Sequence, residues 1–151
     1  MSYNKKDFLM RVDMFNGLPD EYLSKIVALC TEAKYKAGEI ILNIRDATDN
    51  VYLIRKGTVQ IITNPDMLEA KPQLADALLV TLGEGQSFGE MGLVDRGARS
   101  ATVRAASDTE VYVINCDEFL ALCHQDTRLG FLVMRNIAAD LSFKLRYRNL
   151  I

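Results

Sequence analysis

Between Tyr35 and Ile114, short β-branched or aliphatic runs alternate with turn-forming residues, and this pattern constrains the fold more than any other feature of the sequence. Each run is long enough for one strand, and glycine, aspartate or asparagine separates successive runs. The runs are 39–42, 51–54, 58–63, 78–82, 101–105 and 111–114. Many short strands at close spacing are typical of a jelly roll or barrel. We therefore predict a mainly β fold with flanking helices, in which residues 35–114 form a β-roll.

The residues before the β-roll have a helical pattern. Within 1–33, apolar residues recur at steps of three and four. Pro19 followed by Asp20 and Glu21 is typical of a helix start, because proline suits the first turn and acids favour the positive end of the helix dipole. At 151 residues the chain is long enough to bury a core of its own, so we predict one domain over 1–151.

C-terminal helices are predicted over 117–151. Residues 117–123 predict a short helix and residues 127–149 a long one. The long helix carries more apolar residues than one buried stripe requires, and those on its other faces are Phe131, Met134, Ala138 and Phe143. We expect it to pack on the β-roll and also on a second copy of the chain.

The composition limits the kinds of molecule that we expect this protein to bind. The formal net charge of −2 argues against nucleic acid as a direct partner, because binding to DNA or RNA needs a concentrated positive field. Cysteine occurs at three positions without metal-type spacing, which favours reduced thiols in a cytosolic protein: Cys30, Cys116 and Cys123. The N-terminus lacks a signal peptide, and no stretch approaches about 18 apolar residues. We predict a cytoplasmic protein without a membrane partner.

The most specific motif is SFGEMGL at 87–93, followed by RSATV at 99–103. Gly89 lets the backbone approach an anion closely, and Arg99 can supply a forked pair of charged donors to a phosphate. A carboxylate beside a phosphate would be repelled unless it faced another part of the ligand. Glu90 therefore suits a ribose 2′-hydroxyl, which donates to a carboxylate. An anion site next to a ribose site indicates a nucleotide.

The segment SFGEMGLVDRGARSATV at 87–103 resembles the phosphate-binding cassette of the cyclic nucleotide-binding domain family, as in bacterial cAMP receptor proteins. The segments FNGL at 15–18, GEII at 38–41 and VYLI at 51–54 follow the family's order, so the resemblance spans essentially the whole chain. It implies a sensor domain that needs no cofactor, binds cAMP or, less readily, cGMP, and signals through the last helix as a homodimer. The ligand-binding residues it implies are Phe88, Gly89, Glu90, Met91, Gly92, Arg99, Ser100 and Ala101.

The resemblance also implies a pocket for the base. Ile61 and Leu79 would form its apolar walls, and Lys144 would stack a cation on the π face. Each residue has a structural alternative, since Ile61 and Leu79 suit a core and Lys144 suits a solvated helix end. Arg99 could instead pair with a nearby carboxylate, and Glu90 could cap the following helix.

Two departures from the family pattern support a competing hypothesis. Ala98 replaces the usual proline before Arg99, and Lys144 and Leu145 stand where the bacterial receptors offer small hydroxyl side chains to the base. Arg96 is a second arginine that could compete for the anion. The alternative is a degenerate fold that binds no nucleotide and serves as a dimerisation or docking module.

Catalysis and direct DNA binding are not expected. A metal-dependent jelly-roll enzyme would need several converging ligands, whereas His124 is the single histidine and no nucleophile–base constellation is identifiable. Transcription factors of the family continue from the long helix into a helix-turn-helix, but this sequence stops at Ile151. If Ile151 is the natural end, we expect the effector to be another, unknown protein; if the natural chain continues, the effector lies in the part beyond Ile151.

Overall fold

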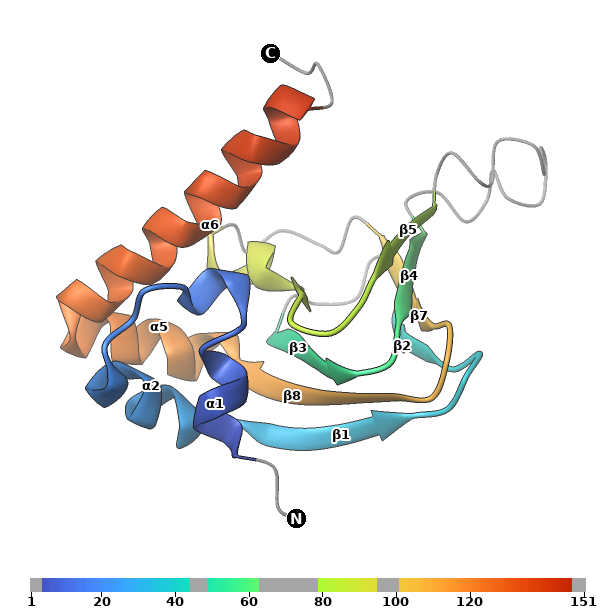
Figure 1. Ribbon diagram of the computed structural model, residues 1–151, viewed down its shortest axis with the longest axis horizontal. Coiled ribbons are helices and arrows are strands. Elements are labelled where there is room, and N and C mark those ends of the chain that lie inside the picture. The colour runs from blue at the N-terminus through green and yellow to red at the C-terminus, as the bar shows by residue number, and fades with distance from the viewer. Residues whose placement is uncertain (1–3, 44–48, 63–78, 95–100, 148–151) are drawn as a thin grey trace.

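The protein is described by a computed structural model over residues 4–43, 49–62, 79–94 and 101–147 (Figure 1). Within these ranges the side chains of five residues lie outside the description: Leu79, Met91, Lys144, Leu145 and Tyr147. No helix in the described ranges is both long and apolar enough to cross a membrane.

Two antiparallel four-stranded sheets form the β-roll. The first has the order β1-β8-β3-β6, with bounds Thr31–Tyr35, Thr109–Asn115, Asn50–Lys56 and Ser87–Phe88. The second has the order β2-β7-β4-β5, with bounds Ile40–Leu42, Thr102–Ala105, Val59–Ile62 and Leu79–Leu82. The predicted fold class is confirmed, and every predicted run overlaps a strand of the roll.

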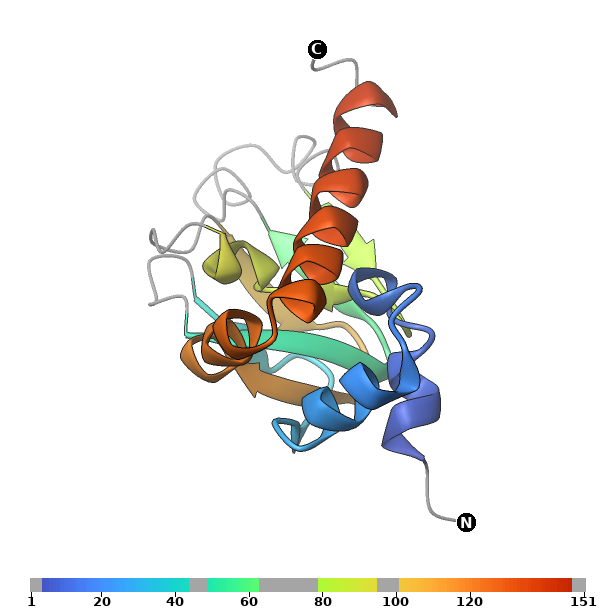
Figure 2. The same ribbon diagram turned by 90° about the vertical axis from the view of Figure 1, so that its left-hand side faces the viewer.

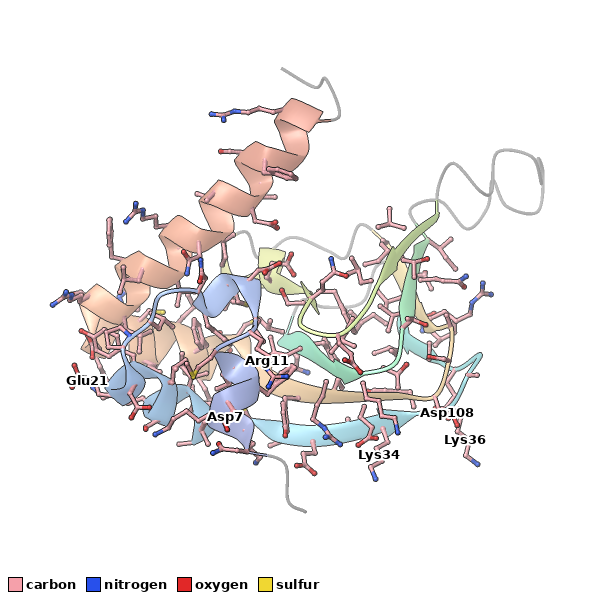
Figure 3. All side chains as sticks on the ribbon, viewed as in Figure 1. Asp7, Arg11, Glu21, Lys34, Lys36 and Asp108 are labelled. Atoms are coloured by element: carbon pink, nitrogen blue, oxygen red, sulfur yellow. The ribbon has the colours of Figure 1, made fainter. Side chains whose placement is uncertain are left out.

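The N-terminal helical part ends earlier than predicted. It consists of α1 (Lys5–Leu9), the 3₁₀ helix η1 (Asp13–Phe15) and α2 (Asp20–Val27), which starts directly after Pro19 as expected. The assignment of residues up to 33 to helices was wrong, because Thr31–Tyr35 form strand β1, paired with β8. Ala33 and Tyr35 contact the core inside the roll, while Lys34 is exposed and points outward in Figure 3. Pairing with a distant strand decides the conformation of this short segment.

The central strands β3 and β8 are buried on both faces and separate two cores. Tyr52 and Ile54 face the core between the sheets, together with Val111. Val51 and Leu53 alternate with them and contribute to a second core between the first sheet and the helices. Figure 2 shows the helices together on one side of the molecule, in front of the strands.

The last two helices, α5 (Cys116–Gln125) and α6 (Thr127–Tyr147), start within one residue of the predicted positions. α6 buries Leu129, Val133 and Ile137 against the helical core, and its C-terminal half extends away from the body of the molecule (Figure 1). The two helices approach closely where Gly130 meets Cys123, because an added Cβ at Gly130 would lie 2.9 Å from the Cβ of Cys123.

Candidate nucleotide site

The motif at 87–93 begins as the short edge strand β6 of the first sheet. Ser87 pairs with Leu53 and Phe88 with Tyr52. Phe88 is 3% exposed, and its ring stacks on that of Tyr52 with centroids 4.9 Å apart and planes 3° from parallel. Phe88 thus anchors the start of the motif inside the roll, which is a structural role beside its predicted place in the ligand site.

A tight turn follows the anchored phenylalanine. Gly89 has a φ of 82°, a left-handed conformation that favours glycine, and the short helix η2 (Glu90–Leu93) starts immediately after it. The Gly92 amide donates a hydrogen bond to the Gly89 carbonyl at 3.1 Å, and Gly92 and Leu93 are buried. The positive φ of Gly89 and the helix directly after it form a tight turn, and close approach of a phosphate to its backbone stays a prediction.

Glu90 lies at the start of η2 and lines a cleft between the β-roll and the helices. Its Oε2 atom is buried. The cleft is open to solvent and is lined by Asp13, Met14, Leu82, Gln86, Ser87, Glu90, Asn136, Ile137, Asp140 and Leu141. A carboxylate held at this position can accept a hydrogen bond from a hydroxyl group.

Arg99 and Ser100 lie outside the described residues, so their predicted contacts with phosphate and base stay predictions. Met91 is described by its backbone within η2, and Ala101 is half-buried directly before β7. The structure therefore places Phe88, Gly89 and Glu90 in one turn between β6 and η2.

The structure describes part of the predicted base pocket. Ile61 on β4 is half-buried and contacts the core inside the roll. In the register of β4 and β5, Val80 pairs with Ile61, whereas Leu79 pairs with Ile62. Opposed residues of an antiparallel pair share a face, so Val80, which the sequence reasoning missed, is the stronger candidate for a wall beside Ile61. Strand alternation alone could not reveal this without the register. The side chain of Lys144 is outside the description, and its stacking role stays a prediction.

The interior of the roll beside the motif is apolar with two phenols at its margin. Burial raises the pKa of Tyr35, and the neighbouring Tyr52 and the Glu39 carboxylate raise it further. The Tyr35 phenol therefore stays neutral at physiological pH and can serve only as a neutral hydrogen-bonding group.

The described thiols and the histidine show no catalytic arrangement. Burial raises the pKa of Cys30 and of Cys123 to about 11, which keeps both thiols protonated at neutral pH. His124 is exposed. Within the described ranges, no group of three or more His, Cys, Asp or Glu side chains could hold a metal ion.

The sequence analysis also did not predict the polar contacts that join α6 to the N-terminal helices. Asn136 donates from Nδ2 to the Asn16 carbonyl at 2.8 Å and to the Met14 carbonyl at 3.1 Å. Lys25 on α2 pairs with Asp126 at 3.0 Å, and this hydrogen bond lowers the pKa of Asp126 and raises that of Lys25. These partners lie about a hundred residues apart in the sequence, so no local pattern signals them.

The chain is similar in sequence to a family of known proteins. Residues 32–126 match the family model described as the cyclic nucleotide-binding domain. The cyclic AMP receptor protein of Thermus thermophilus is 32% identical over 139 residues, which cover 91% of this chain and 59% of that protein. The cGMP-dependent 3′,5′-cGMP phosphodiesterase A of Dictyostelium discoideum is 32% identical over 116 residues, which cover 77% of this chain and 12% of that protein.

The same relationship is seen in three dimensions. The crystal structure of the Thermus thermophilus catabolite activator protein superposes with a TM-score of 0.71 at 31% identity, covering 91% of this chain and 60% of that one. The chain thus spans less than two thirds of the length of each of these proteins. The family model covers more than half of the chain, and its range includes the β6–η2 turn and the motif around it. The chain belongs to the cyclic nucleotide-binding domain family.

Proposed function

We propose that this chain is a regulatory sensor domain that binds a cyclic nucleotide, cAMP ahead of cGMP, and signals through α6. The observation that carries the proposal is the β6–η2 turn. Gly89 adopts a left-handed conformation directly before Glu90, and Phe88 anchors the turn by stacking on Tyr52. This turn presents backbone and a carboxylate at one place, as a ligand with both a phosphate and a ribose requires.

Each part of the ligand has a candidate partner. Arg99 neutralises the cyclic phosphate with charge-assisted hydrogen bonds, and Ser100 donates to a phosphate oxygen or to the base. Glu90 accepts the ribose 2′-hydroxyl. Ile61 and Val80, which pair across β4 and β5, support the base from the roll.

The choice of cAMP rests on the relatives. The Thermus thermophilus relative is named as a cyclic AMP receptor protein, whereas the Dictyostelium phosphodiesterase is named as cGMP-dependent. The first match covers more of this chain, and it favours cAMP. Both proteins also support a regulatory role for the region they share with this chain.

The apolar residues on the outer face of α6 favour a homodimer. Phe131 and Ala138, seven residues apart, lie on one exposed face of α6, which we call the α6 seam, whereas Met134 and Leu141 also pack against the helical core. Phe131 is 63% exposed and Ala138 is exposed, although both lie on a helix whose opposite face is fully buried. A second copy of α6 would cover this seam.

A docking module without a ligand is the second candidate, and the same seam favours it. Dimerisation through α6 needs no nucleotide, and Ala98 lacks the rigidity of the family's proline. The two candidates differ in one property, which is saturable binding of a cyclic nucleotide.

Titration calorimetry with cAMP and with cGMP tests the proposal. Arg99→Ala should weaken binding by on the order of 10- to 100-fold, because a charge-assisted pair of hydrogen bonds is lost. Arg96→Ala removes the other arginine of the same segment; it should leave the affinity unchanged if Arg99 holds the phosphate, and a loss at Arg96 but not at Arg99 would assign the anion to Arg96. Glu90→Gln should mainly reduce discrimination against 2′-deoxy analogues. No heat with either nucleotide, from folded and nucleotide-free protein, would favour the docking module.

A further inference from the structure

The FNGL segment at 15–18 forms a turn between η1 and α2. Asn16 has φ and ψ of −57° and 130°, and Gly17 has a φ of 78°. The Leu18 amide donates to the Phe15 carbonyl at 3.2 Å, which closes a type II turn with glycine at its third position. Asn16 and Gly17 are exposed, whereas the residues on either side of them are buried. Asparagine occurs at eight positions of the chain, and Asn16 is the only one followed by glycine.

An asparagine followed by glycine can react with its own main chain. Hydroxide removes the proton of the Gly17 amide, and that nitrogen attacks Cγ of Asn16 to close a five-membered succinimide ring. The bond from Cγ to Nδ2 breaks, and the nitrogen leaves as ammonia after taking a proton from water, which restores the hydroxide. Water then opens the ring at one of its two carbonyls. The product is aspartate or isoaspartate, in which the main chain runs through the former side-chain carbonyl.

The surroundings of the turn favour the attack on Cγ. A Cβ added at Gly17 would have nothing within 4 Å, so no neighbouring group shields the glycine. The amides of Asn16 and Leu18 donate to main-chain carbonyls, but the Gly17 amide donates no hydrogen bond within the described part of the chain. The side-chain amide of Asn16 likewise has no hydrogen bond to any described residue. Because Asn16 is exposed, water and hydroxide reach both reacting groups.

One hydrogen bond opposes the ring closure. Asn136 of α6 donates from Nδ2 to the Asn16 carbonyl at 2.8 Å. This carbonyl and the Gly17 nitrogen belong to one planar peptide group. Bringing the nitrogen to Cγ requires rotation about the Cα–C bond of Asn16, which turns the carbonyl away from Asn136. The reactivity of Asn16 therefore depends on a residue 120 positions further along the chain.

We propose that Asn16 is a modification site that converts spontaneously to aspartate and isoaspartate in the folded protein, and that the hydrogen bond from Asn136 slows this reaction. The modification places a carboxylate in the turn before α2, and isoaspartate also lengthens the main chain there by one carbon. Isoaspartate at an exposed turn is a substrate for enzymes that methylate isoaspartyl carboxylates. The reaction involves no nucleotide, so the inference does not depend on the proposed function.

Incubation of the folded protein in mildly alkaline buffer, followed by peptide mapping with mass spectrometry, tests the proposal. In the wild-type protein, aspartate and isoaspartate should accumulate at position 16 before any other asparagine. Asn16→Gln keeps an amide at this exposed position but would need a six-membered ring, so products at position 16 should disappear. Asn136→Ala should speed the loss of Asn16 about fivefold, because one hydrogen bond no longer opposes the rotation. Ser142→Ala, at an exposed position of the same helix, is the control and should react at the wild-type rate.

Two references decide the outcome. In urea-unfolded protein the hydrogen bond is absent, so wild type and Asn136→Ala should lose Asn16 at the same rate. An intact Asn16 in folded wild type, after the unfolded chain has reacted completely, would overturn the modification site. Asn115, which caps α5, reports general unfolding. An Asn136→Ala variant that reacts at the wild-type rate at position 16, or that speeds the loss of Asn115 equally, would overturn the role of Asn136.

Discussion

Two glycines with the same backbone conformation allow one contact in the β-roll to be measured separately from backbone strain. Gly57 and Gly38 have φ values of 93° and 92°. A Cβ added at Gly57 would lie 2.4 Å from the Asp108 carbonyl oxygen and 2.8 Å from the Thr109 Oγ1, whereas at Gly38 nothing lies within 4 Å. Alanine at either position meets the same strain, but only Gly57→Ala must also displace the neighbouring backbone.

The expected losses in the free energy of unfolding follow from this difference between the two glycines. The strained backbone costs about 1–2 kcal/mol for alanine, and this is all that Gly38→Ala should lose. At Gly57 the displaced backbone belongs to a set of hydrogen bonds in which the Thr58 amide donates to Ser107 Oγ at 3.0 Å and Thr109 Oγ1 donates to the Ser107 carbonyl at 2.8 Å. Disturbing these hydrogen bonds should add at least about 1–2 kcal/mol to the loss in the free energy of unfolding. Gly57→Ala should therefore lose roughly 3 kcal/mol or more in total.

Equilibrium urea unfolding of the two variants and the wild type measures both losses. A free energy of unfolding that falls by the same amount in both variants would refute the reasoning, because the close contact would then contribute nothing. An unchanged denaturant m value is needed for the comparison, since it shows that the extent of unfolding is the same.

Three further predictions test the site and its surroundings. Phe88→Ala should lower the free energy of unfolding by about 3–5 kcal/mol because it empties a buried ring position against Tyr52, and a loss below about 1 kcal/mol in urea unfolding would contradict the anchoring role. Phe131→Glu should convert a dimer to a monomer in light scattering while leaving the fold unchanged, and an unaltered mass would exclude the α6 seam. Asp126→Asn should lower the free energy of unfolding at neutral pH but not in acid. The hydrogen bond from Lys25 lowers the pKa of Asp126 below its ordinary 3.8, so the stabilisation by this carboxylate is present above about pH 4 and is lost as the pH falls through the lowered pKa. Unfolding curves for wild type and variant that differ equally at every pH would rule this out.

The sequence predicted those parts of the fold that depend on local pattern. β-branched runs between turn residues located strands in both sheets, and apolar spacing located α2, α5 and α6. The glycine before Glu90 predicted the turn that the structure has, because a left-handed conformation is a local property of one residue. The cassette motif likewise identified the family before any fold was known.

The local sequence pattern did not predict residues whose conformation or facing depends on a partner far away in the sequence. Residues 31–33 were assigned to a helix although they start β1, because a short segment takes its conformation from pairing with β8. Val80 was missed because the face of a residue depends on the register between β4 and β5.

The sequence by itself therefore determined the class of fold, most of its elements and the motif that defines the family, since each of these is encoded in the order of neighbouring residues. The tertiary structure alone decided which side chains form the cleft beside Glu90. Asp13, Gln86 and Asn136 come from three separate stretches of the chain and share one cleft. Asn136 donates to backbone carbonyl groups, which every residue carries, so its partners at Met14 and Asn16 could be recognised only after the helices had packed.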